Sequence, residues 1–121
     1  DRLTSVQDTI GQVLKAPSGR GQYASVSVAS MYMPAVAEAV PFAIEVAEYA
    51  QGKTGRDVGV LAAATGNRSG IMWLSFAESL DQMMDDRQAL ETDPGYLDFF
   101  KRSEDLYVAG SLEDSIWQLL P

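Results

Sequence analysis

The sequence contains no cysteine and no histidine among its 121 residues. The missing cysteines exclude disulfides, thiolate nucleophiles and Cys-ligated metals. The missing histidines remove the commonest general base, the commonest transition-metal ligand and the usual proximal ligand of haem. No acidic spacing matches a calcium-binding loop either. We therefore expect a protein that works without a metal or other cofactor.

Positive charge is also scarce, because 9 Lys and Arg stand against 17 Asp and Glu, which gives a net charge of −8. A phosphate backbone or an anionic membrane surface would be repelled on average, so we expect neither nucleic acid nor membrane as a partner. No apolar run is long enough to span a bilayer, and no signal-peptide pattern is visible. A cytoplasmic location is the expectation.

Hydrophobic residues make up 46% of the chain and charged residues 21%, which is ordinary for a globular protein. The length favours one domain with a real core. Apolar residues recur at helical spacing between Asp1 and Lys15, so we predict an N-terminal helix over residues 1–16. The breaker cluster Ala16-Pro-Ser-Gly-Arg-Gly21 then separates this helix from a domain over residues 22–121.

Within that domain, patterning and capping signals predict strands and helices in alternation. The order is β-α-β-β-α-β, which is the ferredoxin-like split unit, so we predict an α+β fold with a four-stranded antiparallel sheet. The predicted elements are a strand over Gln22–Tyr32, a helix over Pro34–Gln51, strands over Asp57–Thr65 and Ile71–Phe76, helices starting at Ser79 and at Asp93-Pro94, and a last strand over Ser115–Leu120.

The second half resembles the NIPSNAP-like branch of the dimeric α+β barrel superfamily, which includes antibiotic-biosynthesis-monooxygenase-like proteins. The resemblance is carried by the aromatic strand Ile71–Phe76, the helix start Ser79-Leu80, the run Arg87-Gln-Ala-Leu-Glu-Thr-Asp-Pro-Gly-Tyr-Leu-Asp-Phe-Phe100 and the closing Ile116–Pro121. It implies a homodimer built through the sheets and a pocket between sheet and helices in each subunit. Superfamily members include cofactor-independent oxygenases, haem-handling proteins, lyases, isomerases and proteins without assigned activity. The fold therefore indicates where a site would lie far more than which function it has.

The candidate pocket consists of Tyr23, Met31, Tyr32, Trp73, Ser75 and Arg87. Trp73 and Tyr23 could stack on an aromatic ligand, although strands are enriched in such residues for packing alone. Arg87 interrupts an apolar helical stripe and could reach a carboxylate or oxyanion, or simply pair with Asp86 or Glu91. We expect the sheet face with Tyr23, Met31 and Trp73 to be too apolar for water and therefore to be covered in a dimer.

Three functions remain open from the sequence. The first is a small-molecule enzyme, such as a cofactor-free oxygenase, whose substrate supplies its own reactivity. The second is a non-catalytic protein that binds a small apolar or aromatic ligand in the same pocket. The third is a dimerisation or interaction module, which should have a filled interior rather than a pocket.

Overall fold

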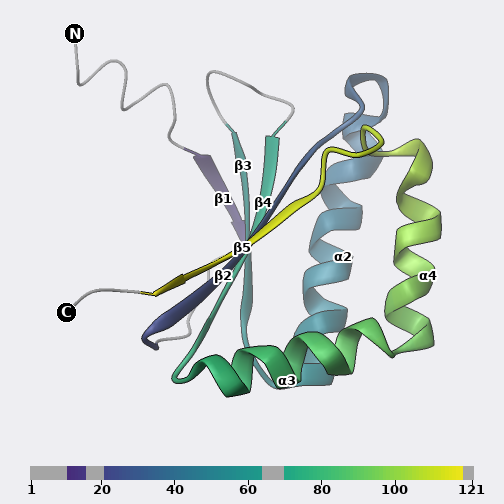
Figure 1. Ribbon diagram of the computed structural model, residues 1–121. Coiled ribbons are helices and arrows are strands. Elements are labelled where there is room, and N and C mark those ends of the chain that lie inside the picture. Colours follow the sequence, from purple (N-terminus) through teal and green to yellow (C-terminus); the bar gives the residue numbers. More distant parts are fainter. Residues whose placement is uncertain (1–10, 16–20, 64–69, 119–121) are drawn as a thin grey trace, which may run out of the picture.

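The computed structural model describes residues 11–15, 21–63 and 70–118. Three helices lie on one side of a twisted antiparallel sheet (Figure 1). The strands are β1 Gly11–Lys15, β2 Tyr23–Ser30, β3 Val58–Ala63, β4 Gly70–Ala77 and β5 Glu113–Gln118. The helices are α2 Val36–Thr54, α3 Leu80–Glu91 and α4 Pro94–Arg102, and short 3₁₀ turns occupy Met33–Ala35 and Ser103–Asp105.

Within the described residues the sheet has the strand order β1-β3-β4-β2-β5. Its last four strands and the helices form the predicted ferredoxin-like unit, so the α+β fold class is confirmed. The sheet has five strands rather than the predicted four, because β1 is added at the edge beside β3. β2 is one of the two inner strands of the predicted unit and pairs with β4 on one side and β5 on the other.

The helix predicted over the N-terminal segment is wrong for Gly11–Lys15, which forms strand β1 instead. Residues 1–10 of that prediction lie outside the described residues. The apolar spacing that suggested a helix is short, and Gly11 is a poor helix former. Backbone pairing with the exposed edge of β3 decides the conformation, and a bulge at Leu14 lets that side chain reach the core.

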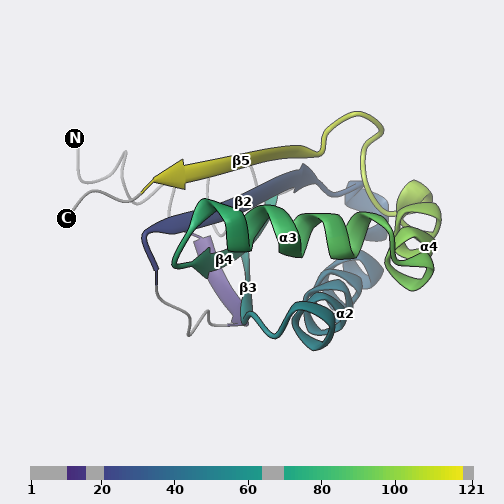
Figure 2. The same cartoon turned by 60° about the horizontal axis from the view of Figure 1, so that its bottom comes forward.

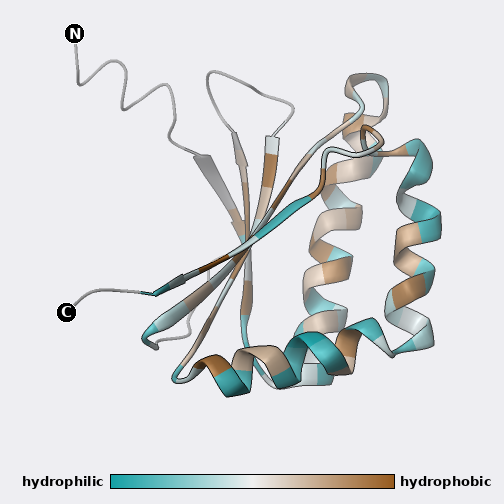
Figure 3. Ribbon diagram, viewed as in Figure 1, coloured by the Kyte–Doolittle hydropathy of each residue, from teal (hydrophilic) through white to brown (hydrophobic). Residues whose placement is uncertain are grey.

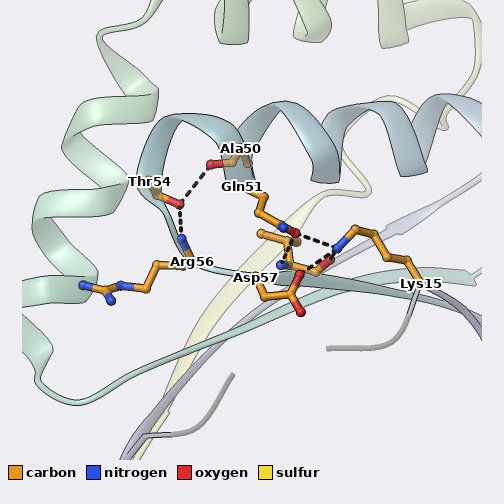
Figure 4. A network of polar contacts seen from close by, with 7 residues as sticks. Lys15, Ala50, Gln51, Thr54, Arg56 and Asp57 are labelled. Carbon is orange, nitrogen blue, oxygen red and sulfur yellow. Dashed lines mark hydrogen bonds and ion pairs between the residues drawn. The ribbon is translucent and has the colours of Figure 1, made fainter. Parts of the chain in front are cut away.

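Lys15 fastens the end of β1 to the rest of the domain (Figure 4). Its ammonium group donates to the Gln51 side chain at 2.7 Å, to Asp57 Oδ1 at 2.8 Å and to the Val58 carbonyl at 2.8 Å. These three acceptors match the three donors of a lysine. The edge strand is therefore tied by polar contacts to the C-terminal end of α2 and the start of β3.

A row of alanines along α2 forms the part of the helix that lies against the sheet. Ala39, Ala43 and Ala47 are fully buried, and Ala50 is nearly so. Because their side chains are single methyl groups, the helix can approach the strands closely. The core cluster combines three of these alanines with Ala29, Met31, Val60 and Ile71. Figure 3 shows hydrophobic colour over much of α2, whereas hydrophilic and hydrophobic segments alternate along α3.

The sheet face that the sequence predicts to be covered by a second subunit is covered by the helices of the same chain. The face with Tyr23, Met31 and Trp73 is turned toward the helices, and Met31 is only 2% exposed. The prediction that this face is open is therefore wrong. The open face carries Val26 and Val28, together with Leu61, Met72, Leu74, Phe76 and Trp117. None of the described helices lies on that side of the sheet in Figure 1, and Trp117 is 60% exposed there. Figure 2 shows β5, which carries Trp117, running beside β2.

Candidate functional site

A cavity of about 360 Å³ lies between the helix-covered face of the sheet and the helices. α2 contributes Phe42, Val46, Ala47 and Ala50 to its wall. α4 and the chain that follows it, from Ser103 to Leu112, close the opposite side. The size falls in the range of sites for small molecules, which are usually apolar hollows with a few placed polar groups.

Six aromatic side chains line the cavity. Phe42 and Phe99 meet edge to face with ring centroids 5.7 Å apart, and Tyr96 and Phe100 do so at 5.4 Å. Such pairs hold each other in defined orientations. The wall is completed by Trp73 and Tyr107, whose centroids are 6.0 Å apart. An aromatic or apolar guest would therefore meet ring faces and edges on several sides.

Trp73 and Tyr107 are fixed by hydrogen bonds to α2. The Trp73 indole N–H donates to the Ala43 carbonyl at 3.0 Å, and the Tyr107 hydroxyl donates to the Ala39 carbonyl at 2.8 Å. Burial raises the pKa of Tyr107 well above its ordinary value, because the phenolate would lose its hydration. Tyr107 is therefore a neutral structural donor at physiological pH.

The sheet contributes a polar strip to the cavity. Ser25, Ser27 and Ser75 lie on the helix-covered face and line the cavity together with Asp114 from β5. Ser27 Oγ donates to Asp114 Oδ1 at 2.6 Å, across paired positions of β2 and β5. Small hydroxyl side chains leave room beside the sheet and also offer hydrogen bonds to a guest.

A second hollow of about 150 Å³ adjoins the first, and we call it the polar annex. Ser25, Ser27, Ser75, Tyr96 and Asp114 line both spaces. The annex adds charged side chains from the connection between α2 and β3 and from α3, namely Arg56, Asp86, Arg87 and Glu91. Arg56 Nε donates to Asp86 Oδ2 at 3.0 Å.

Tyr96 stands where the apolar cavity meets the annex. Its pKa is raised mainly by burial and further by the negative charges of Asp114 and Glu91, while the positive charge of Arg87 opposes the rise. The Tyr96 hydroxyl is therefore protonated at neutral pH and can donate a hydrogen bond.

The N-terminus of α4 is held by a cap that α2 supports. Asp93 accepts a hydrogen bond from Tyr96 N at 2.8 Å, as the Asp-Pro signal predicts. The Tyr49 hydroxyl also donates to Asp93, and Lys53 Nζ lies 3.3 Å from its carboxylate. The Tyr49 bond is the main cause that lowers the pKa of Asp93, followed by the Tyr96 amide. This cap fixes Tyr96 at the start of the cavity wall.

The residues predicted for the pocket are only partly brought together. Trp73 and Ser75 line the cavity, and Arg87 lines the annex together with Ser75. Met31 is packed in the core, and Tyr32 is 53% exposed. Met31, Tyr32 and Tyr23 are not among the residues that line the cavity or the annex.

Sequence reasoning missed several cavity residues. Tyr96, Phe99 and Phe100 follow one another at helical i, i+3, i+4 spacing, a signal that could have marked an aromatic face of α4. Asp114 and Tyr107 gave no such signal. Asp114 reaches Ser27 only through the register of β2 with β5, and Tyr107 follows the last 3₁₀ turn.

Two further properties concern only the part of the chain that the structure describes. No group of three or more acidic side chains there is placed to hold a metal ion. None of the helices is long and apolar enough to cross a bilayer.

The sequence matches no protein-family model and no curated protein sequence. Its structure is similar to a NIPSNAP-like domain protein from Burkholderia xenovorans, with a TM-score of 0.66 and 16% identity over 82% of this chain and 84% of that one. A NIPSNAP family protein from Agrobacterium tumefaciens gives 0.66 and 17% over 88% and 93%. A Nitrosomonas europaea protein named as an antibiotic biosynthesis monooxygenase gives 0.63 and 13% over 84% and 94%. The predicted resemblance is thus confirmed at the level of the fold.

Proposed function

We propose that this protein binds a small apolar or aromatic molecule in the cavity between its sheet and helices. The observation that carries the proposal is the combination of about 360 Å³ of space, an aromatic wall and a polar strip of serines. An interaction module would be expected to have a filled interior, so the cavity disfavours that alternative. The similar structures, which include one named as a monooxygenase, favour a small-molecule role by fold analogy.

The binding test compares two substitutions on α4. Phe100 and Leu97 are exposed to nearly the same extent, at 45% and 44%, but only Phe100 lines the cavity. Calorimetric titration with 2-naphthol should show binding to the wild type and to Leu97→Ala. Phe100→Ala should weaken it by roughly fivefold, because one aromatic contact is worth about 1 kcal/mol. Equal affinities for both variants, or no binding to any of the three proteins, would contradict the proposal.

Spectroscopy can locate the ligand independently. The chain has two tryptophans, so Trp117→Phe leaves Trp73 as the only indole. The indole N–H resonance of Trp73 should shift on addition of 2-naphthol, because its ring lines the cavity. A resonance that stays unchanged at saturation would place the binding site elsewhere.

We also propose that two copies associate through the open sheet face. Its apolar side chains are only partly buried by the described residues, and a large apolar patch of this kind is characteristic of an interface. Val26 lies on an inner strand of this face, between Leu74 of β4 and Ser115 of β5. Light scattering at micromolar concentration should give a dimer for the wild type and a monomer for Val26→Lys.

The matched control for the dimer is Met84→Lys, because Met84 is 47% exposed on α3, away from the open face. This variant should remain dimeric. A monomeric wild type, or a monomeric Met84→Lys variant, would contradict association through the sheet. Circular dichroism should show that both lysine variants keep the fold.

Catalysis is a second candidate, favoured by the protonated Tyr96 hydroxyl at the junction of the cavity and the annex. In a cofactor-free oxygenation the substrate would supply the electrons, and a neutral phenol could donate a hydrogen bond to its developing oxyanion. Oxygen uptake with a readily oxidised naphthol should then be faster with the wild type than with Tyr96→Phe. An uptake equal to that of the buffer would leave binding as the function.

A further inference from the structure

The polar annex carries more hydrogen-bond donors than its own side chains use. Arg87 forms no ion pair or hydrogen bond with any of the residues that the structure describes, although it is half-buried. Arg56 is engaged through its Nε atom, which donates to Asp86. A guanidinium presents five N–H donors in a planar fork, so the guanidinium of Arg87 is available to a guest.

The acceptors of the annex are less available. Asp86 already accepts from Arg56, and Asp114 accepts from Ser27. Glu91 and Asp114 are exposed to solvent, which screens their charges, whereas Arg87 is half-buried. A guest group in this space would therefore meet unused donors from Arg87 and, beside it, the hydroxyl of Tyr96.

We propose that Arg87 determines specificity and that the ligand is an aromatic carboxylate. Its rings would occupy the apolar cavity, and its carboxylate would lie in the annex against the guanidinium fork of Arg87. This inference rests on the proposed function, because it assumes that the cavity takes an aromatic guest. Arginine suits the role, since its fork matches a carboxylate with two parallel hydrogen bonds.

The surrounding charges set a limit on the guest. Arg56 and Arg87 contribute two positive charges, and Asp86, Glu91 and Asp114 contribute three negative ones, so the formal sum is 2 − 3 = −1. A single carboxylate can be held by direct contact with Arg87 while the exposed acids are screened. A doubly charged phosphate would meet twice the repulsion, so aryl phosphates should bind worse than aryl carboxylates.

The test uses three probes that share one ring system: 2-naphthoate, the neutral 2-naphthamide and the cationic 2-naphthylmethylammonium. Calorimetry on the whole chain should give 2-naphthoate about tenfold tighter binding than 2-naphthamide, as expected for one charge-assisted bidentate contact. Arg87→Gln should make the affinities for 2-naphthoate and 2-naphthamide equal without weakening the binding of the amide. Arg87→Lys should restore part of the preference for the carboxylate. Lys101→Gln removes the same charge from an exposed site outside both hollows and should keep the ratio.

The outcomes separate the two proposals. If naphthoate and naphthamide bind equally to the wild type, or if the cation binds best, the carboxylate inference is overturned while the aromatic cavity stands. The carboxylate inference is also overturned if Lys101→Gln lowers the affinity ratio of naphthoate to naphthamide as much as Arg87→Gln does. The preference for the anion would then come from long-range charge rather than from contact with Arg87. If none of the probes binds, both proposals fall. Far-UV circular dichroism checks that the variants are folded.

Discussion

Removing the hydroxyl of Tyr107 should destabilise the domain by a predictable amount. The hydroxyl donates to the Ala39 carbonyl at 2.8 Å, and Ala39 is fully buried in α2. Tyr107→Phe keeps the ring against Phe42 and Trp73 and deletes only this bond. A neutral buried hydrogen bond contributes about 1 kcal/mol. For a domain of this size that corresponds to a fall of about 4 °C in melting temperature.

The control is Tyr32→Phe, which deletes the same atom from a side chain that is 53% exposed. Since its hydroxyl forms no hydrogen bond with any described residue, the change in unfolding free energy should stay within about 0.5 kcal/mol. Urea unfolding at pH 7 followed by circular dichroism measures both variants. Equal losses, or a larger loss for Tyr32→Phe, would refute the assigned role of Tyr107.

Alkaline pH gives the same prediction a second readout. The pKa of Tyr107 is raised in the folded state above the ordinary value of about 10. Its contribution to stability is therefore complete below about pH 10 and is lost as the pH rises from there toward the raised value. The melting temperature of the wild type should fall more steeply above about pH 10 than that of Tyr107→Phe.

Three further predictions concern the supports of the site. The pKa of Asp93 is lowered chiefly by Tyr49, so its contribution to stability is present above about pH 4 and lost as the pH falls through the lowered value. The melting temperature should therefore fall less steeply with decreasing pH in Tyr49→Phe than in the wild type. An equally steep fall in both proteins would contradict this. A Cβ on Gly95 would overlap with the Tyr49 hydroxyl, so Gly95→Ala should lower the melting temperature, and less in a Tyr49→Phe background than in the wild type. Lys15→Met should speed amide exchange in the β1–β3 ladder while the β2–β4 ladder stays protected; equal acceleration in both would show that Lys15 supports the whole sheet.

Local patterns in the sequence were sufficient for the central elements of the fold. The alternation in β2 and β4 predicted their strands, and Ser79 and Asp93 predicted the starts of α3 and α4, where their side chains do accept the capping bonds. These signals depend only on residues that are close together in the sequence, so they can be recognised without knowledge of the tertiary contacts. The segment Gly11–Lys15 is different, because its conformation depends on pairing with β3, which lies more than forty residues later in the chain.

The site was harder to predict than the fold because it is assembled from distant segments. Alternation sorts the residues of β2 into two sets but does not say which set faces the helices, and the set with Tyr23 and Met31, which was expected on the open face, is the one that faces the helices. Trp73 and Ser75 were found because they share a strand face. Asp114 depends on strand register and Tyr107 on the path of the chain after α4, neither of which is visible in a single sequence.

The alanine row of α2 has a consequence for how proteins built on this scaffold could diverge. Ala47 and Ala50 border the cavity, whereas Ala39 and Ala43 lie outside its lining, toward the packed end. Apart from glycine, any replacement at Ala47 or Ala50 is larger, so it would either subtract volume from the cavity or push α2 away from the sheet. Single substitutions at these two alanines can therefore fit the cavity to smaller guests, while adaptation to larger guests would have to come from shortening the aromatic side chains that α4 contributes to the opposite wall.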